Sequence, residues 1–170
     1  AVAEQQGLVM HLDVAECPPV MGDRDLLFQA VANLLDNAIK YTPDGGEIRL
    51  GLTCAGTSIE LTVSDNGPGI PAAERDKVLQ RFYRLEHSRS SPGSGLGLSL
   101  VAAVAQRHRT ALQLDDNVPG LRATLQFNSR DCAGFRENVE SRGRRFMRMP
   151  TAIVYEPFSC TSDCLTSLDA

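Results

Sequence analysis

The amino-acid sequence predicts a domain of the α+β class. Two segments, residues 26–42 and 96–108, repeat apolar residues at the spacing of amphipathic helices. Short runs of alternating apolar and polar residues, bounded by glycine, proline or asparagine, lie before, between and after these two segments. This pattern is typical of strands joined by turns. With 170 residues, of which 42% are hydrophobic, the chain is large enough for one such domain and an appended segment.

The first strand and the first helix have recognisable limits. Residues 8–14 (LVMHLDV) alternate well enough for a strand, which the following CPPV ends. Asp23 is a suitable N-cap for the helix over 26–42, because an aspartate side chain can accept hydrogen bonds from the first free N–H groups.

A hairpin, a loop and a short helix are predicted next. Residues 47–54 and 58–64 form two strands on either side of AGT, after the turn PDGG. SDNGPGIP (64–71) is too rich in glycine and proline for a helix or a strand. ERDKVLQRFYRL (74–85) predicts a short helix or a helical turn, and we expect Phe82 to pack in the core.

A mobile segment, a helix and two strands complete the domain. Residues 86–95 are polar and glycine-rich, which favours mobility. LGLSLVAAVAQRH (96–108) predicts the second helix. Residues 110–116 and 121–127 predict closing strands around the turn NVPG.

The character of the sequence changes after Phe127. No periodic pattern is sustained, and residues 129–170 hold six basic and six acidic residues. We therefore expect a domain over residues 1–128 and a weakly structured or disordered tail over 129–170.

Charge and cysteine content exclude several classes of function. A net charge of −4 argues against a nucleic-acid surface, which needs a basic patch. No segment resembles a signal peptide or approaches the roughly 18 apolar residues of a bilayer span, so we expect a cytoplasmic chain without membrane contact of its own. The five cysteines are scattered and odd in number, which indicates reduced thiols rather than a disulfide framework. Cys160 and Cys164 have no second Cys or His pair nearby that would complete a metal site.

A polar stripe runs along the first helix. Asn33, Asn37 and Lys40 are spaced at i, i+4 and i+7, which places them on one side of a helix. Amide oxygens suit a hard cation such as Mg²⁺, and a lysine suits a phosphate. Taken alone, the stripe is more typical of a plain polar helix face.

Two glycine-containing loops have both a plain and a functional interpretation. In SDNGPGIP, Asp65, Gly67 and Gly69 suit a tight turn. They also suit a loop that binds a flat ring such as adenine. In that case the ring would lie against the glycine backbone, and the Asp65 carboxylate would accept a hydrogen bond from the amino group of the ring. In SPGSGLGLSLV, Gly95 and Gly97 lead into a helix N-terminus, whose amides and dipole favour phosphate.

The three motifs together are more specific than any one. NLLDNAIKYTPDGG, SDNGPGIP and RFYRLEHSRSSPGSGLGLSLV resemble, in this order, the N, G1, F and G2 boxes of the sensor histidine kinase ATP-binding domain. That domain belongs to the superfamily of gyrase, the heat-shock chaperone and the mismatch-repair ATPase. The resemblance, over about residues 8–128, implies a two-layer sandwich with helices on one face of a mixed, mostly antiparallel sheet, and a mobile lid over ATP.

The resemblance also implies roles for the helix residues and the first loop. By position in the motif, Asn37 would bind Mg²⁺, with Asn33 supporting it, and Lys40 would contact a phosphate. Tyr41 would pack near the adenine. Asp65 would bind the adenine amino group, in a pocket shaped by Gly67 and Gly69.

The F and G2 boxes would complete the site on the phosphate side. Arg81 and Arg84 flank Phe82 and Tyr83, and an arginine of this box is implied to meet the γ-phosphate. The phosphate-binding backbone would be that of Gly95, Leu96 and Gly97.

The implied activity is transfer of the γ-phosphoryl group of Mg·ATP to a histidine on a separate dimerisation helix bundle, with a response regulator downstream. His11, His87 and His108 lack the context of an acceptor, so we expect the acceptor outside this chain and a parent kinase anchored in the inner membrane. Two alternatives stay open: an anti-sigma-type serine kinase of the same superfamily, and a truncated, non-catalytic nucleotide-binding or interaction module.

Two local departures from the family pattern are visible. The usual His-Gly-Gly after the second helix is His108-Arg109-Thr110, which removes a glycine C-cap and predicts a strained or rearranged turn. The late Gly-Thr near the adenine is Gly120-Leu121, which removes a hydroxyl from the base pocket.

Overall fold

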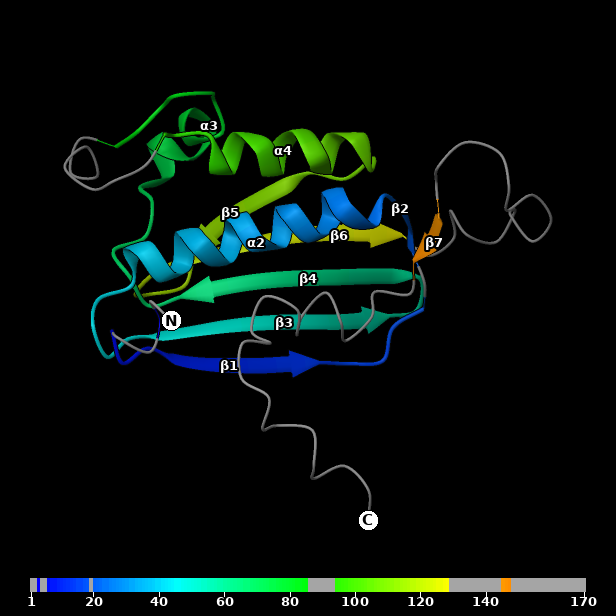
Figure 1. The fold of residues 1–170 in the computed structure, drawn as a ribbon, viewed down its shortest axis with the longest axis horizontal. Coiled ribbons are helices and arrows are strands. Elements are labelled where there is room, and N and C mark those ends of the chain that lie inside the picture. Colours follow the sequence, from blue (N-terminus) through cyan, green and yellow to red (C-terminus); the bar gives the residue numbers. More distant parts are fainter. Residues whose placement is uncertain (1–2, 4–5, 19, 86–93, 129–144, 148–170) are drawn as a thin grey trace, which may run out of the picture.

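Two helices cover one face of a five-stranded sheet in the computed structural model of this chain (Figure 1), which describes residue 3 and residues 6–18, 20–85, 94–128 and 145–147. The strands are β1 (Val9–Val14), β2 (Val20–Gly22), β3 (Glu47–Ala55), β4 (Ser58–Asp65), β5 (Leu112–Asp116), β6 (Leu121–Asn128) and β7 (Arg145–Met147). The helices are α2 (Arg24–Tyr41), α3 (Arg75–Val78) and α4 (Gly97–Arg107), with the 3-10 turn η1 (Ala72–Glu74).

The sheet is mixed and mostly antiparallel, in the order β1-β3-β4-β6-β5. β1 and β3 are parallel, because α2 crosses over between them, and every other neighbouring pair in this sheet is antiparallel. The predicted α+β class, the two long helices and the hairpin are confirmed.

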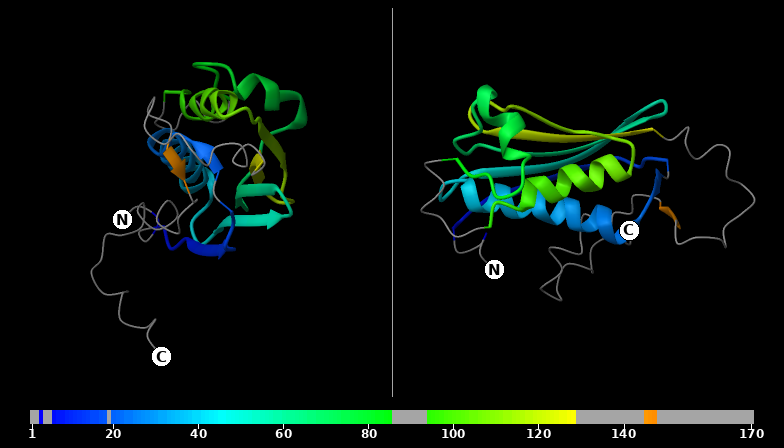
Figure 2. Two further views of the ribbon diagram at one scale, coloured as in Figure 1. Left: turned by 90° about the vertical axis from the view of Figure 1, so that its right-hand side faces the viewer. Right: turned by 90° about the horizontal axis from the view of Figure 1, so that it is seen from above.

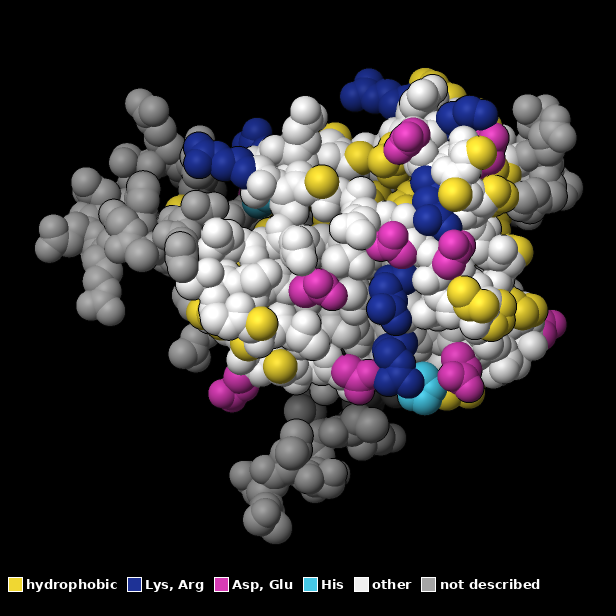
Figure 3. Space-filling view, turned by 180° about the vertical axis from the view of Figure 1, so that it is seen from behind, with side chains coloured by type: hydrophobic (Ala, Val, Ile, Leu, Met, Phe, Trp, Pro, Cys, Tyr) yellow, Lys and Arg dark blue, Asp and Glu magenta, His cyan; other side chains and the backbone are white. Residues whose placement is uncertain are grey.

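The core lies between the sheet and the helices. Side views show α2 and α4 stacked on the same side of the sheet (Figure 2). The inward residues of β3 and β4 alternate with outward polar ones, as period-2 patterning requires. The largest fully buried side chains are Ile48, Leu50, Leu52, Ile59, Leu61, Leu125, Val20 and Val101. On the opposite face, basic and acidic side chains are interspersed (Figure 3).

The N-terminus of α2 and the C-terminus of α4 are joined by one histidine. Asp23 caps α2 as predicted, and its Oδ1 accepts from the Asp25 and Leu26 N–H groups at 3.2 Å each. The Asp23 N–H donates to His108 Nε2 at 2.9 Å, while His108 Nδ1 lies 2.7 Å from the Val104 carbonyl oxygen. The ring therefore bridges two helix ends, which is a structural role.

The turn after α4 is strained, as its sequence predicts. Arg109 has φ 57°, a left-handed conformation that favours glycine. Its N–H donates to the Gln106 carbonyl at 3.1 Å, and the Thr110 N–H donates to the Ala105 carbonyl at 3.0 Å. These two bonds are the Schellman pattern of a helix end, with arginine in the position that glycine usually takes.

The segment 74–85 contains only a helical turn, the shorter of the two predicted structures. Helical structure ends at Val78, and Phe82 has φ 64° with 72% of its surface exposed. The expectation that Phe82 packs in the core is therefore wrong. Arg75 anchors the short helix instead, since it donates to the Ile70 carbonyl at 3.2 Å and pairs with Asp116 at 2.5 Å.

Two short strands were not predicted. β2 pairs antiparallel with β7, so Val20 lies opposite Met147 and Gly22 opposite Arg145. β7 falls within residues 129–170, where we expected a tail. Across the described ranges, no helix has both the length and the apolar character needed to cross a membrane.

Candidate functional site

A cavity of about 270 Å³ opens between α2, the end of β4 and the beginning of α4. The chain path explains this position, because α2 ends, β3 begins and β4 ends at the same edge, with Asp65 opposite Ile48. Most of the residues predicted for the site line the cavity: Asn33, Asn37, Lys40, Tyr41, Asp65, Gly69, Arg84, Gly95 and Gly97. Its apolar wall includes Leu34, Ala38, Val63, Ile70, Val78, Leu98, Leu121 and Ala123.

Three of the predicted residues are not among the lining residues. Gly67 lies behind the Asp65 carboxylate, and a Cβ there would be 2.7 Å from the Tyr41 carbonyl oxygen, so only glycine fits. Leu96 is the N-cap residue of α4. Arg81 is exposed and does not line the cavity.

The polar stripe of α2 faces the beginning of α4. Asn33 Nδ2 donates to the Gln29 carbonyl at 2.7 Å, which leaves Oδ1 as the outward atom of this amide. A Cβ on Gly97 would lie 3.2 Å from Asn37 Nδ2 and 3.3 Å from Asn33 Oδ1. Glycine at 97 therefore lets the first turn of α4 approach both amides closely.

That first turn presents backbone donors. Leu96 makes no side-chain capping hydrogen bond, so the first N–H groups of this 11-residue helix lack a side-chain cap within the described structure. Together with Lys40, whose Nζ lies 4.8 Å from the centre of the Tyr41 ring, they bring positive charge to this side of the cavity, which Asp36 also lines.

Asp65 is a buried carboxylate at the other side of the cavity. Its Oδ1 accepts from the Gly67 N–H at 2.9 Å and the Leu121 N–H at 3.3 Å. Among the described residues no further hydrogen bond is made by this carboxylate, so Oδ2 is left for a ligand. Burial raises the pKa of Asp65 above its ordinary value, although the two backbone hydrogen bonds act in the opposite direction.

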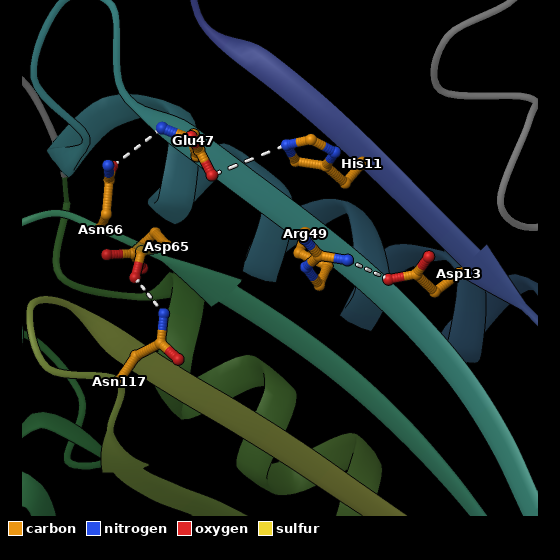
Figure 4. A network of polar contacts seen from close by, with 7 residues as sticks. All are labelled: His11, Asp13, Glu47, Arg49, Asp65, Asn66 and Asn117. Carbon is orange, nitrogen blue, oxygen red and sulfur yellow. Dashed lines mark hydrogen bonds and ion pairs between the residues drawn. The ribbon is translucent and has the colours of Figure 1, made fainter.

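The turn NVPG supports Asp65, which sequence reasoning missed. Asn117 Nδ2 donates to the Asp65 backbone carbonyl at 2.8 Å (Figure 4). Gly120 has φ 114°, and a Cβ there would lie 1.8 Å from the Asp65 carbonyl oxygen. The signal was present in the sequence, because a glycine next to a strand can mark a close backbone approach.

Asn66 fixes the same loop to the sheet. Its Oδ1 accepts from the Glu47 N–H at 2.8 Å, and its own N–H donates to the Glu47 carbonyl at 3.2 Å (Figure 4). Because Glu47 begins β3, this pair holds the loop after Asp65 at the edge where α2 ends.

The residues just before and just after 86–93 are held near the cavity by hydrogen bonds. The Phe82 N–H donates to the Gly95 carbonyl at 3.1 Å, and Gly95 has φ 68°. Tyr83 lines the cavity and its hydroxyl donates to Glu74, which also pairs with Lys77 at 2.8 Å. These hydrogen bonds to Lys77 and Tyr83 lower the pKa of Glu74. The predicted mobility of residues 86–95 falls largely on 86–93, which lie outside the described residues.

The fold and the cavity match one ATPase family. Residues 22–147, most of the chain, match the family described as histidine kinase-, DNA gyrase B-, and HSP90-like ATPase, and the chain belongs to this family. Membership implies ATP as the nucleotide.

Within the family, the chain is similar to sensor histidine kinases. It is 50% identical over 113 residues to the signal transduction histidine-protein kinase/phosphatase MprB of Mycolicibacterium vanbaalenii, and 49% identical over 102 residues to that of Mycolicibacterium smegmatis. These alignments cover 65% and 59% of this chain but only 23% and 21% of the relatives, so the chain spans less than a quarter of their length.

Solved structures agree with this assignment. A mycobacterial sensor histidine kinase MprB has a TM-score of 0.65 and 36% identity, over 75% of this chain and 86% of that chain. The catalytic domain of histidine kinase ThkA has a TM-score of 0.66, over 75% of this chain and 84% of its own, and its 22% identity bears on the fold alone. The chain is thus an ATPase domain of the histidine kinase type.

Proposed function

We propose that this chain binds Mg·ATP in the cavity and transfers the γ-phosphoryl group to a histidine on a separate helical dimerisation domain. The observation that carries the proposal is the arrangement of two unlike ends in one cavity. A buried carboxylate with an open Oδ2 lies at one end, and two amides, a lysine and an uncapped helix N-terminus lie at the other.

The Asp65 end suits adenine. Oδ2 is an acceptor in a mostly apolar surrounding, where a hydrogen bond from an exocyclic amino group discriminates strongly against a base that offers an acceptor. Leu121 contributes an apolar wall and a backbone N–H to Asp65, so base recognition rests on this carboxylate and on stacking space near Tyr41.

The helix end suits a triphosphate. Lys40 supplies a point charge, and the backbone of Gly95, Leu96 and Gly97 leads into the N-terminus of α4, where amides and the helix dipole favour anions. Arg84 lies at the same cavity, whereas Arg81 is exposed and would have to move to reach a phosphate. We therefore assign the phosphate contact of this segment to Arg84.

The donor set also fits Mg²⁺. Amide oxygens of Asn37 and Asn33 lie together beside Gly97, and oxygen ligands shared with phosphates and water are what this ion prefers. When bound, Mg²⁺ would supply charge neutralisation at the phosphates. Lys40, Arg84 and the α4 amides would position the phosphates, and the cavity would exclude water from the reacting group.

The test of the site is Asn37→Ala. We expect at least a tenfold loss of ATP affinity in Mg²⁺, equivalent to about 1.4 kcal/mol, and little change in EDTA. The free energy of unfolding should change little, because Asn37 is only half-buried and alanine is the better helix former. Calorimetric titration of ATP with and without Mg²⁺ measures this.

The control is Gln29→Ala, two turns earlier on α2, at an exposed residue outside the cavity. It should leave ATP affinity unchanged. Equal affinities of wild type and Asn37→Ala in Mg²⁺ would overturn the metal assignment.

Phosphoryl transfer is tested with labelled ATP and a separately supplied acceptor domain of an MprB-type kinase. We expect acid-labile, base-stable label on the acceptor and none on this chain. His108 has both ring nitrogens engaged, and His11 lies on β1 beside Glu47 at 3.6 Å. His87 lies outside the described residues. Binding without transfer would support a non-catalytic module, and base-labile label on serine would support a serine kinase.

A further inference from the structure

Two cysteines lie close together at the end of the sheet opposite the cavity. β1 runs parallel to β3, and beyond it the Ala15 N–H still donates to the Leu52 carbonyl at 2.8 Å. The chain therefore continues along β3, where the Cys54 thiol donates to the Glu16 carbonyl at 3.4 Å. Cys17 follows Glu16 directly, which brings its side chain close to that of Cys54.

The two thiols have different surroundings. Cys54 is exposed, whereas Cys17 is half-buried and packs against the edge of the core. Burial, followed by the contact with Cys54, raises the pKa of Cys17 to about 11. Cys17 is therefore a thiol at neutral pH, and the accessible Cys54 is the group that an oxidant meets first.

We propose that Cys17 and Cys54 form a dithiol that closes to an intramolecular disulfide by exchange with a low-molecular-weight disulfide, RSSR. The Cys54 thiolate attacks one sulfur of RSSR, which forms a mixed disulfide and releases RS⁻. Cys17 then attacks the Cys54 sulfur and expels the second RS⁻. The two thiol protons end on two RSH molecules, so one protein disulfide forms as one RSSR is reduced.

The geometry is compatible with closure. A disulfide needs Cα atoms roughly 4.4–6.8 Å apart. The Cys54 thiol lies 3.4 Å from the carbonyl oxygen of Glu16, the residue before Cys17, so the two cysteines are near neighbours at this edge of the sheet. The bridge would join the end of the β1 segment to β3 and enclose β2 and α2 in one covalent loop. It would leave the cavity open, because that lies at the Glu47 end of β3.

The experiment uses the full chain with Cys132→Ser, Cys160→Ser and Cys164→Ser, so that only the pair remains. The folded protein is treated with oxidised glutathione and followed by intact mass, thiol titration and peptide mapping. We expect loss of both thiols, a mass lower by two hydrogen atoms, no glutathione adduct and one peptide pair joined through Cys17 and Cys54. Two stable adducts, two unreacted thiols or a bridge between chains would overturn the proposal.

Two comparisons test whether the fold directs the reaction. In Cys17→Ser the reaction should stop with one glutathione on Cys54, and in Cys54→Ser the half-buried Cys17 should react more slowly. The equilibrium yield of the bridge should be at least about tenfold higher in native buffer than in urea, because folding holds the thiols together. Equal yields of the disulfide in native buffer and in urea would contradict the proposal that the fold holds the two thiols together.

The pH dependence identifies the second nucleophile. Closure of the mixed disulfide should accelerate by up to about tenfold per pH unit between pH 7 and 9, because burial still raises the pKa of Cys17 after Cys54 has reacted, and the thiolate fraction rises by that factor below the pKa. A closure rate that does not change over this range would contradict the order of attack.

Discussion

Ionisation of Asp65 has a cost to the stability of the fold. Its carboxylate is buried with two backbone hydrogen bonds on Oδ1, and burial raises its pKa. A folded-state pKa above the unfolded value means that the folded protein binds the proton more tightly. The ionised carboxylate therefore lowers the free energy of unfolding above the folded pKa, and this cost disappears as the pH falls through that value.

Asp65→Asn should consequently change nucleotide choice more than stability. An amide can keep the Oδ1 acceptor for Gly67 and Leu121, but it places a donor where Oδ2 accepts. We expect ATP affinity to fall by about 1.5–3 kcal/mol, the cost of losing a hydrogen bond to a charged group, and the preference for ATP over GTP to fall with it. The free energy of unfolding at pH 7 should be unchanged or higher.

The measurements are ATP and GTP titrations and urea denaturation from pH 4 to 8. The stability gain of Asp65→Asn should shrink as the pH falls, because the raised pKa of the wild-type carboxyl lets it take up its proton in the folded state. ATP affinity of the wild type should also weaken on the acid side. A variant that keeps the wild-type ATP to GTP ratio would refute the role of Asp65.

At the scale of elements, α4 begins with a glycine and ends without one. Gly97 allows the first turn to approach Asn33 and Asn37, so its lack of a side chain serves the cavity. Arg109, just after the other end, adopts a left-handed conformation with an exposed side chain. The helix thus lacks the glycine that commonly follows a helix end. Its Schellman hydrogen bonds form although arginine disfavours the left-handed conformation that they require.

Arg109→Gly should therefore stabilise the protein. Relief of the left-handed conformation gains about 1–2 kcal/mol, and the greater freedom of glycine in the unfolded chain removes about 0.5–1 kcal/mol. We expect a net increase of about 0.5–1 kcal/mol in the free energy of unfolding, measured by urea denaturation.

Arg107→Gly is the matched control, since Arg107 is also exposed but is the last residue inside α4. It should destabilise the protein by about 0.5–1 kcal/mol. The same sign for both substitutions would contradict the assignment of strain to residue 109.

For the whole molecule, the cavity depends on elements that end by residue 128. All residues lining it lie between Asn33 and Ala123, and the five-stranded sheet is complete with β6. From the segment 129–170, the described part adds only the β2–β7 pairing of three residues on each strand. We therefore propose that residues 1–128 form the nucleotide-binding unit.

A chain truncated after Asn128 should bind ATP with the affinity of the full chain. Its free energy of unfolding should fall by no more than the loss of a short antiparallel pair, about 1–2 kcal/mol. Calorimetric titration and urea denaturation of both chains measure these quantities. A truncated chain that is folded but binds ATP tenfold more weakly would show that the later residues take part in the site.

The sequence by itself determined the elements whose patterns are long and local. The helices over 26–42 and 96–108, the Asp23 cap and the hairpin all follow from side-chain periodicity and turn residues, which act within a few positions along the chain. The motifs around Asn37, Asp65 and Gly97 also pointed to the family before any coordinates, because together and in this order they resemble the family's own motifs.

Tertiary structure alone decided what depends on distant neighbours. Phe82 lies at the surface because helical structure stops at Val78, at the end of a short helix whose first residue, Arg75, is anchored by the Ile70 carbonyl and by Asp116. Gly120 is needed because its backbone touches Asp65, 55 positions earlier, and Cys17 meets Cys54 only because a parallel crossover brings β1 beside β3. Such contacts join residues from separate elements, and no local pattern encodes them.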